Sequence, residues 1–197
     1  MTSIENMKSH CKYWENMYGF YGKTKEIVGS KFPFKMIEDY GVLFTSENSS
    51  ELKSDENLLI NKAIKRIGGA IQYDYIKTFS TATKVAFSEK SEKVKLFHGL
   101  IHKEESHSHF ELTWIVINDK VIDFRNGVRG IIPEGYTYFG IEIPKKILHE
   151  TIINTSFAIE VELPDFEYKP NPTTIFMKCL PKLLKFYGQN KKINNIK

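Results

Sequence analysis

Four of the six histidines of this sequence stand within twelve residues of one another, beside three glutamates: His98, His102, His107 and His109, with Glu104, Glu105 and Glu111. Alternate side chains of an extended strand share a face, so we expect His107, His109 and Glu111 to lie side by side. Imidazole and carboxylate groups in such a set can bind zinc, iron or manganese. The spacing matches no established metal motif, so a solvated polar loop is the other interpretation.

The element that must position these residues is a β-hairpin from His109 to Phe124. Its first strand alternates apolar residues on one face: Phe110, Leu112, Trp114 and Val116. Asn118 and Asp119 supply the turn, and the second strand ends at Asp123. At the end of a hairpin, Asp123 can act structurally by bonding to the backbone or to Arg125 or Arg129.

The rest of the chain shows a helical half followed by a half rich in strands. Apolar spacing predicts helices at 2–21, 54–67 and 72–87, strands at 94–102, 136–143 and 152–163, a short helix at 144–149 and a last helix at 174–187. Residues 31–34 read as loop, 40–44 as a strand or buried turn, and 127–130 as a turn rather than a phosphate loop. The expected class is α+β, with N-terminal helices packed on a mainly antiparallel β-sheet and a C-terminal helix.

Length and composition favour one domain. The 197 residues are 41% hydrophobic, enough to fill a single core, so we expect one α+β domain at 1–190 and a basic flexible tail at 191–197. No apolar run is long enough to span a membrane, and the start of the chain has no signal peptide pattern. We therefore expect a cytoplasmic protein with no membrane partner.

Charge and cysteine content exclude further classes. The net charge of +4 is mild and comes largely from the tail, so nucleic acid is not the expected partner. Cys11 and Cys179 are far apart and in no redox or metal spacing, which predicts buried thiols. Frequent Lys, Ile and Asn indicate an AT-rich coding sequence, as in a phage or low-GC bacterium.

Three segments together resemble the papain-like and transglutaminase-like cysteine hydrolases, in particular the small bacterial and phage members. They are the strand Val94-Lys95-Leu96-Phe97-His98-Gly99-Leu100-Ile101, the hairpin sequence Leu112-Thr113-Trp114-Ile115-Val116-Ile117-Asn118-Asp119-Lys120-Val121-Ile122-Asp123, and the strand Tyr138-Phe139-Gly140-Ile141-Glu142-Ile143-Pro144. The match covers about half of the chain. In that family a cysteine opens the central helix, a histidine lies on one hairpin strand, and an aspartate or asparagine on the other strand orients the imidazole.

The resemblance implies catalytic roles for His109 and Asp123. It also implies a cleft between the helix at 72–87 and the hairpin, lined by Gln72, Tyr73, His107, Glu111 and Trp114. The sequence departs from the family pattern at two places, since 69–74 contain no cysteine and Leu112 stands where the family has its histidine. Trp114, the residue expected opposite Asp123, is five residues from His109, or roughly 17 Å along a strand.

These departures favour a catalytically degenerate domain that binds a protein or small-molecule ligand and needs no cofactor. Two alternatives stay open. One is an active thiol hydrolase that uses Cys11, His109 and Asp123. The other is a metal-dependent enzyme built on His107, His109 and Glu111.

Overall fold

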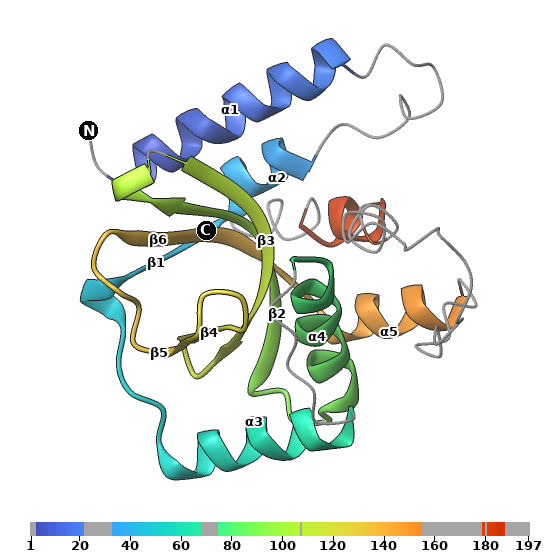
Figure 1. The fold of residues 1–197 in the computed structure, drawn as a ribbon. Helices are drawn as coiled ribbons and strands as arrows, with labels where there is room; N and C mark the ends of the chain where they lie inside the picture. Colours follow the sequence, from blue (N-terminus) through green and yellow to red (C-terminus); the bar gives the residue numbers. More distant parts are fainter. Residues whose placement is uncertain are drawn as a thin grey trace, which may run out of the picture.

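The computed structural model of the chain describes residues 3–21, 33–67, 75–106, 108–154, 179 and 181–187 (Figure 1). The expected α+β class is confirmed. The helices are α1 (Ser3–Tyr21), α2 (Pro33–Tyr40), α3 (Ser54–Arg66), α4 (Tyr75–Ser88) and α5 (Lys145–Asn154). The strands are β1 (Val42–Thr45), β2 (Val94–Lys103), β3 (Ser108–Ile117), β4 (Lys120–Asp123), β5 (Val128–Gly130) and β6 (Tyr136–Ile143). Residues 181–187 are also helical.

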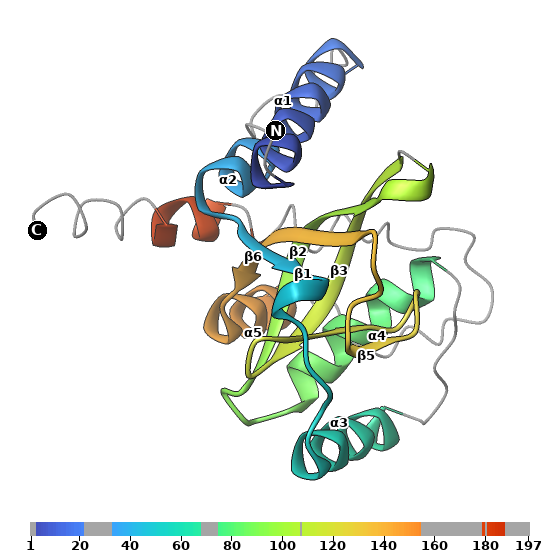
Figure 2. The same cartoon turned by 90° about the vertical axis from the view of Figure 1, so that its left-hand side faces the viewer.

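The six strands form one curved sheet in the order β1-β6-β2-β3-β4-β5 (Figures 1 and 2). Every pair of neighbouring strands is antiparallel. The long strands β2 and β3 lie at the centre, and the expected hairpin joins β3 to β4. Its turn has positive φ angles at Asn118 (47°) and Asp119 (64°), as a two-residue hairpin turn requires.

Both faces of the sheet are buried. On one face, Ile115 and Ile117 belong to a core that includes residues of α1, α2, α3, α4 and α5. On the other, Leu112, Trp114 and Val116 belong to a second core made by the strands and the segments beside them. The alternation predicted along the first strand of the hairpin is therefore confirmed.

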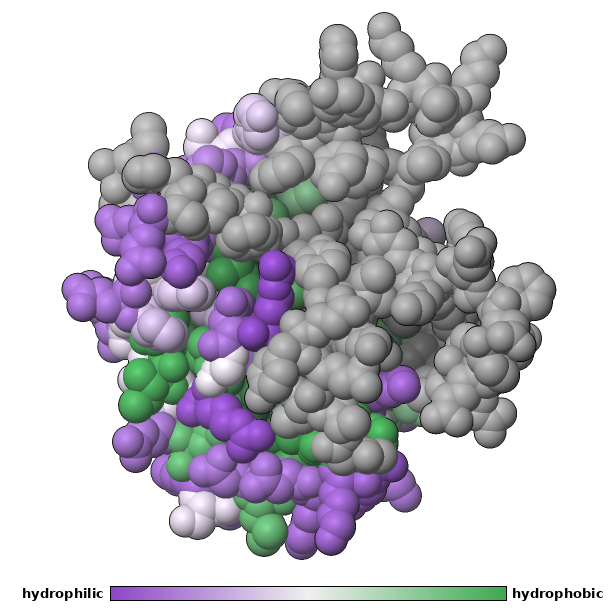
Figure 3. Space-filling view, viewed as in Figure 1, coloured by the Kyte–Doolittle hydropathy of each residue, from purple (hydrophilic) through white to green (hydrophobic). Residues whose placement is uncertain are grey.

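Two helices show why the chain folds this way. Ala82, Val85 and Ala86 form the fully buried face of α4, which packs against β3 and β2. The helix α3 buries Ile60, Ala63 and Ile64, and its outer surface is mostly hydrophilic in the space-filling view (Figure 3). Apolar residues at three- and four-residue steps thus place one face of each helix in the core.

The structure corrects three details of the sequence prediction. The strand predicted at 152–163 is wrong at its start, because α5 continues as a helix to Asn154; residues 155–178 lie outside the described part. The helix α2 lies where only loop was expected at 33–34, and the uncertain 40–44 segment leads into strand β1. Val128–Gly130 is a short edge strand rather than a turn. The predicted tail at 191–197 lies outside the described residues.

Candidate functional site

Asp123, at the end of β4, is held in a dense set of hydrogen bonds. Its Oδ1 accepts from the backbone N–H of Arg125 (2.8 Å) and of Asn126 (3.3 Å). Its Oδ2 accepts from Asn126 Nδ2 (2.6 Å) and from Tyr138 Oη (2.9 Å). Aspartate bonding to the backbone two residues later is an Asx turn, so Asp123 fixes the bend between β4 and β5.

The Tyr138 hydroxyl group is part of the same set. Burial, followed by the charge of Asp123, raises the pKa of Tyr138, so the phenol keeps the proton that it donates. Asp123 itself is only 1% exposed. The four donors match the roughly four lone-pair positions of a carboxylate.

The register of the hairpin separates Asp123 from His109. Ile115 pairs with Ile122, so the next position places Asp123 beside Trp114. His109 lies at the far end of β3, where it pairs with His102 of β2. Five residues of strand, roughly 17 Å, therefore lie between the backbone of His109 and the position opposite Asp123.

Two other positions singled out by the family pattern are core residues. Leu112, at the family's histidine position, is buried in the second core. Trp114 is fully buried between Phe97 (ring centres 6.1 Å apart) and Tyr138 (5.4 Å). Both side chains pack inside the fold rather than line a cleft.

Cys11 and Cys179 are both fully buried in the core on the helical side of the sheet. The expectation of buried thiols is confirmed for both residues. Burial raises the pKa of Cys179, which keeps it in the unreactive protonated form. Neither sulfur lies where a substrate can reach it without opening the core.

Several predicted site residues lie beyond what the structure describes. Gln72, Tyr73 and His107 are outside the described residues, and of His109 and Glu111 only the backbone is described. The cleft at the start of the 72–87 helix and the metal set of His107, His109 and Glu111 therefore stay predictions.

The other histidines of the cluster have separate environments. His98 is buried in the sheet, and its Nδ1 lies 3.0 Å from Thr113 Oγ1 on the neighbouring strand. His102, near the end of β2, has its ring centre 6.3 Å from that of His10 on α1, with the ring planes at 18°. Sequence reasoning missed His10, because nothing in a local pattern links α1 to the end of β2. Among the described side chains, no group of three histidines, cysteines or acids is arranged to hold a metal ion.

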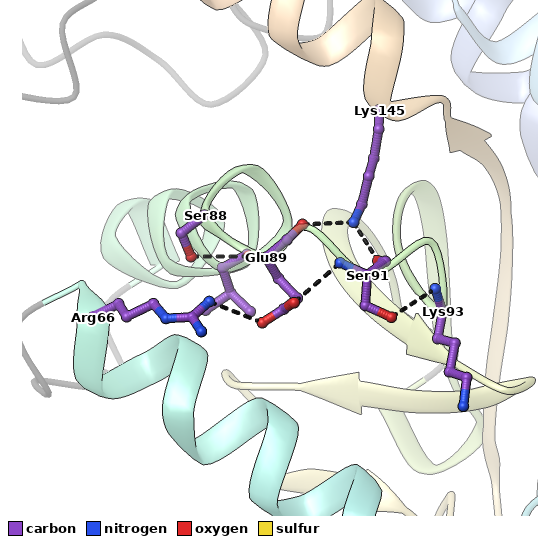
Figure 4. Close-up of polar contacts among 7 residues, drawn as sticks. Arg66, Ser88, Glu89, Ser91, Lys93 and Lys145 are labelled. Carbon is purple, nitrogen blue, oxygen red and sulfur yellow. Dashed lines mark hydrogen bonds and ion pairs between the residues drawn. The ribbon is translucent and has the colours of Figure 1, made fainter.

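A charged network joins the end of α4 to the start of α5 (Figure 4). Glu89 accepts hydrogen bonds from Arg66 of α3 (3.1 Å) and from the backbone N–H of Ser91 (3.0 Å). Lys145 donates to the backbone oxygens of Glu89 (2.6 Å) and Ser91. Burial lowers the pKa of Lys145, while the nearby Glu92 and Glu89 oppose that shift.

Beside this network lies an open depression of about 530 Å³, which we call the α4/α5 depression. Acidic and basic side chains and one histidine line it: Glu89, Lys90, Glu92, Lys145, Lys146, His149 and Glu150. Glu89, Lys145 and Glu150 are engaged in contacts within the protein. Lys90, Glu92 and Lys146 are exposed, and none of them forms an ion pair with another described residue. Sequence reasoning missed this site because its residues come from two segments about fifty positions apart.

Comparison with known proteins adds no relative: no family model, curated protein or solved structure matches the chain. Within the described residues, no helix combines the length and the apolar character needed to cross a bilayer.

Proposed function

We propose that this chain is a non-catalytic binding domain with the layout of the papain-like and transglutaminase-like hydrolases. The observation that carries the proposal is the hydrogen bonding of Asp123. Its Oδ1 accepts from the backbone of the bend after β4, and its Oδ2 accepts from Asn126 in that bend and from Tyr138 of β6. This bonding supports a structural role for the acid of the expected triad.

The arrangement of helix and hairpin supports the layout. The helix α4 precedes β2 and β3 in the chain and packs against both strands. The family's central helix has this relation to its hairpin. The full burial of Cys11 argues against the alternative thiol hydrolase, because a nucleophile must meet its substrate.

Among the described residues, the α4/α5 depression offers an open surface for a ligand. Lys90, Glu92 and Lys146 present both charges at its rim, beside the partly buried ring of His149. A polypeptide segment carries charges of both signs and hydrogen-bonding groups along its backbone. We therefore assign the depression to a protein ligand.

Thiol reactivity tests the absence of catalysis. The native chain is treated with iodoacetamide at neutral pH, and the modification of Cys11 and Cys179 is followed by mass spectrometry. We expect both thiols to react far more slowly than a model thiol, because each has no exposed surface.

The same reaction in denaturant is the control, since both thiols must become reactive once the core opens. The variants Cys11→Ser and Cys179→Ser identify which sulfur reacts. Fast modification of native Cys11, at or above the rate of a model thiol, would overturn the proposal in favour of an active hydrolase.

A further inference from the structure

Two of the acidic side chains that line the α4/α5 depression are neutralised by cations from outside it. Glu89 pairs with Arg66 of α3 at 3.1 Å, and Glu150 pairs with Lys182 at 2.9 Å. Neither of these cations belongs to the lining. Glu92 is thus the one acidic residue of the lining that forms no ion pair with another described residue.

The basic side chains of the lining are not neutralised in this way. Lys90, Lys145 and Lys146 line the depression, and none of them forms an ion pair with a described residue. The hydrogen bond and charge of Lys182 lower the pKa of Glu150, and the charge of Lys146 contributes least to that shift. Toward a ligand, the depression therefore presents three ammonium groups and one carboxylate.

Lys145 differs from the other two lysines because it is partly buried. It donates to the backbone oxygens of Glu89 and Ser91 (Figure 4). An ammonium group has three N–H donors, so one is left for a ligand. Neutral carbonyl groups accept the hydrogen bonds of this cation without cancelling its charge. Burial lowers the pKa of Lys145, and the charges of Glu92 and Glu89 offset that effect only in part.

A carboxylate is the group that suits this position. A partly buried cation without a counter-charge is unfavourable, and a carboxylate beside it removes that cost. A hydrogen bond between two charged groups is also about twice as strong as one between neutral groups. Aspartate and glutamate side chains carry such a group on a polypeptide, which is the class of ligand assigned to the depression.

A nucleic acid strand suits the depression less well. It carries a negative charge on every phosphate along its backbone. Glu92 is exposed among the lysines of the lining and would repel such a row of charges. A peptide can place one carboxylate at Lys145 and a neutral or basic residue beside Glu92.

We propose that the α4/α5 depression binds an acidic polypeptide segment, and that an aspartate or glutamate of this segment accepts a hydrogen bond from Lys145. Lys90 and Lys146 add positive charge on either side of that contact. The inference rests on the proposed function, because it specifies the charge of the protein ligand and the residue that anchors it.

Fluorescence anisotropy of the full chain with three labelled peptides tests the proposal. The peptides are capped and of equal length, with glycine alternating with glutamate, lysine or glutamine. We expect the glutamate peptide to bind and the other two to give no signal. Lys145→Gln should weaken binding by about tenfold, because glutamine keeps two N–H donors for the backbone oxygens and loses the charge.

The rim residues give graded effects of opposite sign. Lys90→Gln and Lys146→Gln should each weaken binding of the glutamate peptide by about threefold, and Glu92→Gln should strengthen it by about threefold. All three side chains are exposed, so these variants keep the test decisive if Lys145→Gln does not fold. Circular dichroism checks the folding of each variant.

The matched control is Lys62→Gln, which removes the same charge from an exposed lysine of α3 outside the lining. This variant should bind the glutamate peptide as the unchanged chain does. An equal loss of affinity in Lys62→Gln would show that only the net charge of the chain matters.

Three further results would overturn the proposal. They are the absence of binding of the glutamate peptide, equal binding of the lysine or glutamine peptide, and tighter binding of a labelled single-stranded oligonucleotide that Lys145→Gln abolishes. The last result would assign the depression to nucleic acid. None of them changes the thiol test, so a failure of the acidic ligand is distinguishable from a failure of the non-catalytic function.

Discussion

Asp123 and Glu56 are buried carboxylates that fix the turns on either side of β4. Asp123 holds the bend after β4. Glu56, on α3, reaches the turn before β4: its Oε1 accepts from Asn118 Nδ2 and its Oε2 from Lys120 Nζ, both at 2.7 Å. Glu56 also accepts from the backbone N–H of Lys53, which caps the start of α3. The carboxylate of Glu56 thus links α3 to the hairpin through its contacts with Asn118 and Lys120.

Replacing Glu56 by Gln tests this link. The Glu56 side chain is 2% exposed and that of Lys120 is 10% exposed, so the substitution leaves a buried ammonium group without its counter-charge. We expect Glu56→Gln to lower the free energy of unfolding by about 3 kcal/mol, measured by urea denaturation at neutral pH. The control Glu47→Gln changes an exposed glutamate and should alter stability by less than about 0.5 kcal/mol. Equal stability of the two variants would contradict the role of Glu56.

Glu56 should also control the acid stability of the fold. The hydrogen bond from Lys120 is the largest cause that lowers the pKa of Glu56, which falls from 4.5 to about 2. A carboxyl group with a lowered pKa in the folded state contributes stability above its unfolded pKa and loses it as the pH falls. We expect the unchanged chain to lose stability between pH 4.5 and about 2, and Glu56→Gln to show a shallower loss over that window. Parallel pH profiles of the two proteins would count against this account.

At this scale the sequence predicts only local partners. The structural alternative for Asp123, bonding to the backbone near Arg125, was available because those residues are adjacent in the chain. The partner of Glu56 could not be predicted in this way. Lys120 lies 64 positions away in the sequence, and only the packing of α3 against the hairpin brings the two side chains together. The same limit applies to His10 and His102.

At the scale of the elements, the close packing of β2, β3 and β6 depends on two glycines. Gly99 and Gly140 are direct partners across β2 and β6. A Cβ atom at Gly140 would lie 2.6 Å from Cη2 of Trp114 and 2.5 Å from the backbone oxygen of His98. The indole ring of Trp114 therefore lies against the strand only because position 140 has no side chain.

Gly140→Ala tests that close approach. We expect it to destabilise the fold by about 3 kcal/mol, because the ring of Trp114 and a backbone oxygen must both move. The control is Gly127→Ala, at a glycine with φ of 67° and no atom near its would-be Cβ, which should cost only about 1 kcal/mol from backbone strain. Urea denaturation followed by tryptophan fluorescence measures both. A smaller loss at Gly140 than at Gly127 would show that Trp114 does not require this contact.

The elements whose apolar residues repeat at a clear helix or strand spacing were predictable from the sequence. The elements without such a repeat were not. The helices at α3 and α4 and the strands β2, β3 and β6 follow clear apolar spacing. The strand predicted at 152–163 failed at its start because β-branched residues such as Ile152 and Ile153 favour strands only in isolation, and here they continue α5, whose buried face includes Ile147 and Leu148. The eight residues of α2 are too few for a periodic signal, and their helix depends on packing against α1.

At the scale of the whole molecule, the described residues that could do chemistry lie at separate places rather than in one site. Asp123 lies near the β4–β5 bend, the pair of His10 and His102 at the far end of β2, and the α4/α5 depression beside the start of β2. The α+β class followed from composition and pattern. The sequence could not predict where these groups lie, because their positions depend on strand register and on helix packing that only the folded chain sets.

The most direct test of this account is a double-mutant cycle between Asp123 and Tyr138, measured by urea denaturation. If Asp123 is a structural acceptor, Asp123→Asn should cost about 2 kcal/mol, because hydrogen bonds to a charged group are lost. Tyr138→Phe should cost less, and the pair should show a coupling energy of about 1 kcal/mol or more. A coupling near zero, with a stable Asp123→Asn variant, would contradict the structural role and return Asp123 to the list of catalytic candidates.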